Sequence, residues 1–487
     1  MNSKLRWWAL LAVSLATFMT TLDNNIVNVA LPTIQRDLGL TISGLEWVVS
    51  GYILMFAGLM LVGGRLADVY GRRRVFLVGL TVFTVASLLA GLSPNAAVLI
   101  ASRALQGLGA ALLTPAGLAI LPAAFPDEKE RNAAIGIWGG VTALSLALGP
   151  FTGGLISDRW HWGWIFLLNV PLGVITYALA AAVVRDTSDD RARRRLDLAG
   201  LATSAVALFG TTYALIEGER RGWTSPLILG MLALAAVAAA AFVATEARST
   251  DPMIELSLFR ARVFTGGTLA TGLWAFGVFG VYFFSALYLQ NVLGFSPTRA
   301  GAAFVPMALV TAAVAAVSAS LVGRLGMHRV VAGGLGLMAI AILGVASVSQ
   351  HGSIANLMPW MVVYGVGAGL LVPLTSAVLG ALPAARAGVA SGVLNVSREV
   401  FGLLGVTVLG AIVSARQTAK ARTGFEPVQA FLSGYRFALL IAVAIIAIGV
   451  PLSLYTLRTR RAEVAAVPAA AEAVPDDGVA APAQAAA

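Results

Sequence analysis

The sequence predicts an all-α integral membrane protein with fourteen membrane-spanning helices. Its 487 residues are 58% hydrophobic and only 11% charged, whereas about a quarter of the residues in a soluble domain are charged. Apolar runs of about twenty residues, long enough to cross a bilayer, recur along the chain. Basic residues gather in the short segments between these runs, which is the charge pattern that orients membrane helices.

Counting the apolar runs in order gives the positions of the spans. They are expected near residues 8–30, 45–64, 75–93, 97–121, 133–156, 164–184, 197–216, 226–245, 264–289, 300–322, 330–349, 357–381, 388–413 and 434–457. With both termini in the cytoplasm, roughly 22 Lys and Arg residues fall in cytoplasmic segments and about 8 fall outside. One span more or fewer would move about half of these basic loops to the outer side of the membrane, so the charge distribution supports fourteen spans.

Composition also excludes several classes of function. The net charge of +10 would suggest nucleic-acid binding in a soluble protein, but here the Arg residues lie in short loops and no nucleic-acid partner is expected. Cysteine is absent, and the three histidines (His161, His328, His351) are scattered in loops, so no metal site is expected. The sequence has no Gly-x-x-x-x-Gly-Lys-Ser/Thr motif, which argues against an ATP-driven pump. We expect neither an enzyme nor a cofactor.

A short, basic, glycine-containing hairpin, Gly64–Arg74, joins the second and third spans. The positive-inside rule places it in the cytoplasm, and it fixes the side of every other loop. Asp68, near the end of the second span, can pair with an Arg or a helix N-terminus across the hairpin or in the other half of the protein.

The chain contains an internal repeat. Gly107–Pro115 in the fourth span recurs, with changes, as Gly365–Pro373 in the twelfth. Two six-span halves separated by two further spans explain this spacing, and parallel six-span repeats are a transporter architecture. The expected units are an N-terminal bundle (1–190), two interposed spans (191–260), a C-terminal bundle (261–460) and a disordered cytoplasmic tail (461–487).

Each ionisable group inside a span raises the free energy of membrane insertion by about 2.5–3.5 kcal/mol or more, so its presence suggests a function or a partner. Asp23 and Arg103 both fall in the outer half of the membrane. They can act as a proton site with a neighbouring charge that adjusts its proton affinity, or as static contacts between helices. Glu399, near mid-bilayer, is a second candidate proton site, a counter-ion for cationic substrates, or an ion-pair partner. Its neighbour Arg398 should not face it, because adjacent side chains on a helix point apart.

Two further features concern helix packing and substrate contact. The stretch Gly149–Gly154 contains Pro150, which predicts a kink in the fifth span, flanked by small residues that allow close helix approach. A hinge and a plain packing contact are both compatible with it. Aromatic residues of the ninth span, including Trp274, Phe279 and Tyr282, either line a cavity or face lipid.

Several of these stretches together resemble the fourteen-span drug/proton antiporters (EmrB/QacA type) of the major facilitator superfamily. Residues that resemble the family's four main motifs are Gly64, Leu66, Ala67, Asp68, Gly71, Arg72 and Arg73; Asp23 with Val27–Pro32; Arg103, Gln106, Gly107 and Gly109; and Gly136, Gly149, Pro150, Gly153 and Gly154. The resemblance implies that the set containing Arg103 and Gln106 takes part in proton coupling. It also implies that the set from Gly136 to Gly154 is an antiporter motif, which indicates export. The sequence departs from the family's motifs at Asn24, Val69, Ser145 and Glu399.

The residues and the resemblance together predict a proton-driven exporter of amphipathic small molecules, such as antibiotics or related metabolites, that works by alternating access. A nutrient symporter and a non-transporting receptor or scaffold are the alternatives. The expected partners are the substrate, protons and the lipid bilayer, and we expect a monomer in the cell membrane. Residues expected to line the substrate cavity are Asn28, Gln106, Trp274, Phe279, Tyr282, Gln290, Asn395 and Arg398.

Overall fold

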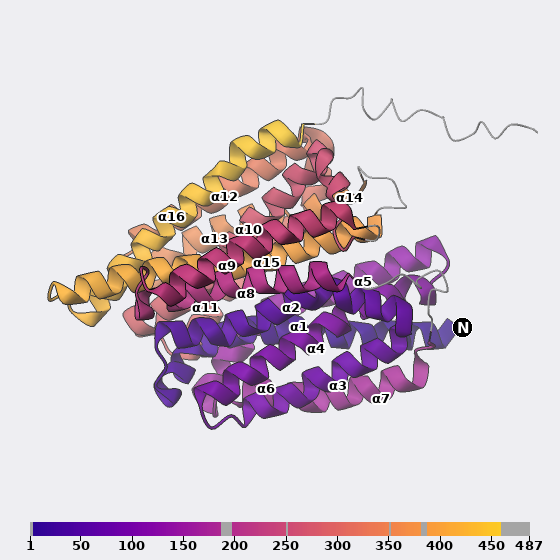
Figure 1. The fold of residues 1–487 in the computed structure, drawn as a ribbon, viewed down its shortest axis with the longest axis horizontal. Helices are drawn as coiled ribbons and strands as arrows, with labels where there is room; N and C mark the ends of the chain where they lie inside the picture. The colour runs from indigo at the N-terminus through magenta and orange to yellow at the C-terminus, as the bar shows by residue number, and fades with distance from the viewer. Residues whose placement is uncertain (1–2, 187–196, 250–251, 350–351, 381–386, 459–487) are drawn as a thin grey trace, which may run out of the picture.

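A computed structural model describes residues 3–186, 197–249, 252–349, 352–380 and 387–458, and all regular elements in them are helices (Figure 1). Residues 191–196, at the start of the expected interposed unit, His351 and the expected tail at 461–487 lie outside the described residues. The helices are α1 Ser3–Leu38, α2 Ile42–Tyr70, α3 Arg72–Gly91, α4 Ala96–Ala124, α5 Glu128–Arg159, α6 Trp164–Leu167, α7 Asn169–Val183, α8 Leu198–Arg221, α9 Pro226–Arg248, η1 Leu256–Arg260, α10 Arg262–Leu287, η2 Tyr288–Val292, α11 Pro297–Leu325, α12 Met327–Ser347, α13 Ile354–Leu370, α14 Leu374–Gly380, α15 Ala387–Arg422 and α16 Pro427–Thr456.

The membrane-spanning helices agree with the sequence prediction except at the twelfth span. Within the described residues, 13 helical segments are long and apolar enough to cross a membrane, and α13 is a shorter apolar helix of 17 residues. The sequence predicted one continuous helix over 357–381. The structure instead ends α13 at Leu370 and restarts the chain as α14, because Pro373 has no amide hydrogen and its ring clashes with the preceding turn.

One histidine prediction is also wrong. His328 lies in the first turn of α12 rather than in a loop, because α12 begins at Met327, directly after Gly326, which has a φ of 83°. His161 does lie between helices, after α5.

The helices form two bundles with a helix pair beside them (Figure 1). Helices α1 to α7, indigo to magenta, pack together through α1 with α5 and through α4 with both α2 and α3. Helices α10 to α16 form the second bundle, in which α10 packs on α15 and α12 on α16. The interposed helices α8 and α9 pack on each other, and α8 also contacts α2 and α15, one helix from each bundle.

The internal repeat reappears in the packing. In the first bundle, Gly79 of α3 and Gly109 of α4 each lie against the other's backbone carbonyl, so an added Cβ at either would come within 2.9 Å of it. In the second bundle, Gly334 of α12 and Gly367 of α13 do the same, at 2.8 and 2.7 Å. Small residues permit such close helix crossings. The two halves therefore repeat a helix crossing as well as a sequence.

The bundles meet tightly at one end of the molecule, which we call the closed end. There the C-terminal part of α5 around Gly154 packs on the N-terminal part of α11 around Pro297 and Gly301. At the same end Glu46 of α2 contacts Gly410 of α15. A Cβ added at Gly154 would lie 2.2 Å from the carbonyl oxygen of Pro297, and one at Gly301 would lie 2.1 Å from that of Pro150. Thr298 also donates a hydrogen bond to Asp158 across the bundles, at 2.6 Å.

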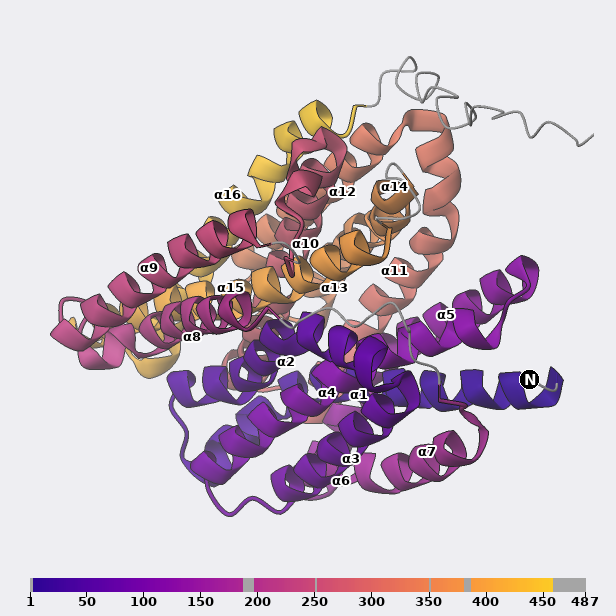
Figure 2. The ribbon, with the colours of Figure 1, turned by 45° about the vertical axis from the view of Figure 1, so that its right-hand side comes forward.

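Towards the other end, α5 and α11 separate. Figure 2 shows the two helices together near the closed end and diverging from it. Gly136, Gly139 and Gly140 of α5 and Gly323 of α11 have no atoms within 4 Å of an added Cβ, and most described side chains of α11 beyond Phe304 are half-buried or exposed. On the topology expected from the charge distribution, the closed end would face the outside of the cell and the separated end the cytoplasm.

Candidate functional site

Asp23 of α1 and Arg103 of α4 form an ion pair inside the first bundle, as the sequence suggested they could. Arg103 Nη1 donates to Asp23 Oδ2, and both side chains have 0% relative exposure. Charges on two neighbouring helices are therefore joined where water does not reach them. Removing one partner of such a buried pair leaves an uncompensated charge, typically at a cost of about 3–5 kcal/mol.

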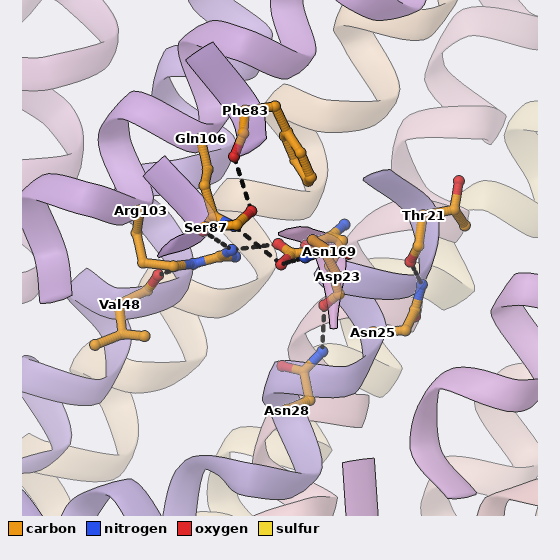
Figure 3. Close-up of polar contacts among 11 residues, drawn as sticks. Thr21, Asp23, Asn25, Asn28, Val48, Phe83, Ser87, Arg103, Gln106 and Asn169 are labelled. Atoms are coloured by element: carbon orange, nitrogen blue, oxygen red, sulfur yellow. Dashed lines mark hydrogen bonds and ion pairs between the residues drawn. The ribbon is translucent and has the colours of Figure 1, made fainter. Parts of the chain in front are cut away.

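Three polar side chains complete the cluster around this pair (Figure 3). Gln106, one helical turn after Arg103, accepts from Arg103 Nη1 at 2.8 Å and donates to Asp23 Oδ1 at 3.1 Å. Asn169, at the start of α7, donates to the same Oδ1 at 2.8 Å. Ser87 of α3 accepts from Gln106 Nε2 at 2.7 Å. The carboxylate of Asp23 thus accepts hydrogen bonds from two helices besides α1, and its protonation would disturb all of them.

The guanidinium of Arg103 is also held from its other side. Its Nε donates to the carbonyl of Val48 in α2 at 3.1 Å, and its Cζ lies 4.5 Å from the ring centroid of Tyr52 and 5.6 Å from that of Phe166. Aromatic faces stabilise a cation when water is excluded. Arg103 therefore has binding partners on α2 that do not depend on the charge of Asp23.

Asn169 and Ser87 were not among the residues selected from the sequence. Asn169 is 1% exposed and Ser87 is fully buried. Asn169 is an amide in an otherwise apolar run, a signal that could have been used because buried amides need partners. Ser87 also donates to the carbonyl of Phe83 at 2.8 Å. A serine in a membrane helix commonly bonds its own helix in this way, so the sequence held no clear signal for it.

The prediction for Arg398 and Glu399 is wrong. The side chains were expected to point apart, but Arg398 donates from Nε at 3.1 Å and from Nη2 at 2.8 Å to Glu399 Oε1. The long arginine side chain bends round the helix, because Glu399 is 2% exposed and its charge would otherwise be unpaired. Glu399 Oε2 remains buried without a hydrogen bond among the described residues.

The residues expected to line one substrate cavity occupy several different places. Gln106 belongs to the Asp23 cluster and is fully buried. Asn28 and Asn395 donate to carbonyls of their own helices, at 3.2 and 3.0 Å. Gln290 donates to the carbonyl of Val29 at 2.7 Å and so joins the second bundle to the first. Only Tyr282 of this set lines either of the two cavities described for the structure.

That cavity lies inside the second bundle, between α10, α11, α12 and α13, and has a volume of about 40 Å³. Its walls include Phe304 and Met307, and the ring of Phe304 lies 4.3 Å from that of Tyr282. The hydroxyl groups of Tyr282 and Tyr364 are buried here without hydrogen-bond partners among the described residues. The two phenol groups are unsatisfied polar groups in an apolar wall, and the cavity is much smaller than a ligand pocket of about 300–1,000 Å³.

The glycines of the predicted antiporter motif do not share one environment. An added Cβ at Gly149 would lie 2.7 Å from Asn25 Cβ, and one at Gly153 would lie 2.5 Å from the carbonyl of Ile26, so both keep α5 against α1. Gly154 faces α11 instead. Gly136 has open space around it. The motif therefore places α5 against both bundles at the closed end.

The hairpin after α2 holds the expected pairing. Asp68 accepts from Arg72 Nε and Nη2 at 3.4 and 3.3 Å, and Gly71 supplies the tight connection with a φ of 102°. Arg72 also donates to the carbonyl of Ala119 at 3.2 Å, and Arg73 donates to that of Ala181 at 2.6 Å. The charged hairpin is thereby tied to α4 and α7 of its own bundle.

Comparison with known proteins identifies the family. Residues 13–406 match the family model described as Major Facilitator Superfamily, which is well over half of the chain. The chain belongs to the major facilitator superfamily. It is therefore a multi-pass membrane transport protein and not an enzyme.

Relatives of this major facilitator include resistance proteins. It is 39% identical to the multidrug resistance protein Stp of Mycobacterium tuberculosis, over 86% of this chain and 78% of the relative. It is 36% identical to the tetracenomycin C resistance and export protein of Streptomyces glaucescens (84% and 76% covered), and 38% identical to the methylenomycin A resistance protein of Streptomyces coelicolor (82% and 84%).

Among solved structures, it resembles a bacterial homologue of the human lysosomal transporter Spinster in an inward-facing and occupied conformation. The TM-score is 0.68 at 15% identity, with 94% of this chain and 98% of that chain covered. At this identity the similarity concerns the fold alone.

Proposed function

We propose that this major facilitator exports amphipathic small molecules, antibiotics or related metabolites, from the cytoplasm in exchange for protons. The observation that best supports proton coupling is the Asp23–Arg103 pair, which is fully buried and surrounded by hydrogen bonds from α4 and α7. The relatives named for drug resistance and export support the class of substrate.

The proposed mechanism is alternating access. With the closed end outside, the protein is open to the cytoplasm, where substrate enters between α5 and α11. When the closed end opens, a proton from outside neutralises Asp23 and weakens its bond to Arg103, which keeps its contacts with Val48 and Tyr52. Return to the inward-facing state restores the pair and releases the proton to the cytoplasm.

In this proposal, substrates with polar and aromatic groups reach the wall that contains Tyr282 and Tyr364. The protein acts as a monomer in the cytoplasmic membrane with both termini inside, and the proton gradient is its energy source. No step requires a cofactor.

The direct test is transport in reconstituted vesicles. Purified protein of one orientation is placed in vesicles with an imposed pH gradient, and movement of antibiotics and cationic dyes is measured together with internal pH. We expect substrate to move against the direction of proton flow. Movement of substrate and protons in the same direction would instead indicate the symporter. If no tested compound moves, with or without a pH gradient, the result would favour the receptor or scaffold.

The charged hairpin provides a separate prediction. Replacing Asp68 with Asn should reduce the transport rate about tenfold, which corresponds to about 1.4 kcal/mol, while substrate affinity stays unchanged. The reason is that Asp68 is partly exposed in this state and, among the described residues, its side chain bonds only within its hairpin, so it is free to bind the other bundle when the cytoplasmic side closes.

The control is Arg74→Gln. Arg74 is 77% exposed and pairs with Asp186, and exposed pairs contribute little. We expect its transport to match the unmodified protein. Transport rates and binding affinities, measured separately, check the prediction, and a loss of affinity in Asp68→Asn with an unchanged rate would contradict it.

A further inference from the structure

Glu46, in the second turn of α2, is a buried carboxyl group that the proposed mechanism does not use. It is 1% exposed, and it makes no hydrogen bond or ion pair with any residue that the structure describes. Its Oε1 is buried without a partner. A charged carboxylate in this position would lack both water and a cation, and burial of an unpaired charge is far more costly than burial of the neutral acid.

The position of Glu46 lies on the contact between the two bundles. Its Oε1 rests against α15, because an added Cβ at Gly410 would come within 2.1 Å of it. Further along the same pair of helices, Gly392 lies against Leu61. Ser50, one turn after Glu46 on α2, is fully buried, and its hydroxyl has no hydrogen-bond partner among the described residues. Separation of α2 from α15 at the closed end would expose Glu46 to water.

The interposed helix α8 lies beside this contact but directs no described cation at Glu46. Trp47, the residue after Glu46, donates from Nε1 to Glu217 Oε1 at 3.2 Å, which places the carboxylate of Glu217 beside this part of α2. Arg220 and Arg221 pair with Glu217 rather than with Glu46.

The cations on the other helices that contact α2 are bound to other groups, exposed, or remote from Glu46. Arg103 of α4 pairs with Asp23 of α1. On α15, Arg416 lies over the ring of Phe437, 4.3 Å from its centroid, and Arg398 pairs with Glu399. Also on α15, Lys420 lies over the ring of Phe425, 4.5 Å from its centroid, and Arg422 in the last turn is exposed. On α1, Arg36 donates to the carbonyl of Pro32 and Arg6 pairs with Glu130. On α3, Arg72, Arg73 and Arg74 lie at the opposite end of α2 from Glu46. No cation is therefore directed at Glu46 from the helices that surround it, within the part of the chain that the structure describes.

We propose that Glu46 is a second proton-binding site, separate from Asp23, that holds its proton while α2 lies against α15 and releases it when the two helices part at the closed end. The inference rests on the alternating access set out above, but not on the identity of the substrate. Because the closed arrangement binds the proton more tightly than the open one, a lower external pH favours the closed end staying closed.

The first experiment observes the proton directly. Infrared spectra of the purified protein and its variants are recorded near neutral pH and subtracted from one another. The signal of interest is the carbonyl stretch of a protonated carboxylic acid. We expect one such band that is lost in Glu46→Gln, is shifted but retained in Glu46→Asp, and persists in Asp23→Asn. Absence of any band that depends on Glu46 would overturn the proposal. Thermal unfolding of each variant confirms that the spectra come from folded protein.

The second experiment measures the closed end itself. The chain contains no cysteine, so Ser43→Cys in α2 and Ala419→Cys in α15 can carry a pair of spin labels whose distance reports opening. The measurement is made in the Asp23→Asn background, where the remaining pH response belongs to other groups. One linked proton changes the closed-to-open ratio by up to about tenfold per pH unit, and we expect this response to disappear in Glu46→Gln and to remain in Glu46→Asp.

The two proposals fail in different ways. A pH response of the closed end that survives in Glu46→Gln overturns the second proton site and leaves drug export untouched. Failure of vesicles to move any drug, with the response of Glu46 intact, removes the proposed substrate class and leaves the proton site standing.

Discussion

Proton-driven efflux by Asp23→Asn should fall to the level of empty vesicles. The substitution removes the titrating group but keeps a side chain of nearly the same shape, whose amide oxygen can still accept from Arg103. The unpaired charge of Arg103 should lower the free energy of unfolding by up to about 3–5 kcal/mol, but Arg103 retains its bonds to Gln106 and Val48, so the helices should stay together. Efflux is measured in reconstituted vesicles with a pH gradient, and folding is measured by thermal unfolding in detergent.

Two controls separate a coupling defect from a folding defect. Asp23→Glu keeps a carboxyl group and should retain measurable proton-driven efflux. Substrate exchange without a pH gradient should persist in Asp23→Asn, because exchange needs binding and motion but no net proton movement. Normal gradient-driven efflux by a well-folded Asp23→Asn protein would remove Asp23 from the proton pathway.

Gly301→Ala should shift the protein away from the state with the closed end closed, and Gly154→Ala should do the same. A methyl group at either position would lie 2.1–2.2 Å from a backbone carbonyl oxygen of the opposite bundle, a distance at which one backbone must move. A destabilisation of about 1.4 kcal/mol would change the closed-to-open ratio tenfold. We expect at least that change, together with a comparable loss of efflux.

The matched control is Gly140→Ala, on the same helix as Gly154. An alanine there meets no atom within 4 Å, so it should leave the ratio unchanged. Spin-label distances across the closed end give the ratio for all three variants. An equal response of Gly140→Ala and Gly154→Ala would show that helix propensity, and not the close contact between bundles, causes the effect.

The sequence was sufficient for the fold because hydropathy and charge act along the chain. Span positions follow from apolar length, and the repeat around Gly107 and Gly365 follows from residues that must be small for helices to cross closely. The pairing of Asp23 with Arg103 was also predictable, since two opposite charges at the same membrane depth have few other partners.

Other parts of the site depend on three-dimensional packing that no local pattern encodes. The bond between Arg398 and Glu399 requires a side-chain bend that helix geometry disfavours and burial imposes. The end of α13 before Pro373 depends on how far a helix tolerates one proline. Glu46 stood in the sequence as an ordinary residue at the start of a span, and only its contact with α15 shows that it is buried.

The composition of the closed end has a consequence for the rate of opening. Among the described residues, its contacts are glycine against backbone carbonyl, hydrogen bonds from Thr298, Gln290 and Asn291, and a carboxyl group without a cation, with no ion pair between the bundles. Ion pairs weaken as salt screens them, whereas close steric contacts do not. The barrier between the two states is thus set by shape, and the transporter should open at a similar rate in dilute and in concentrated salt.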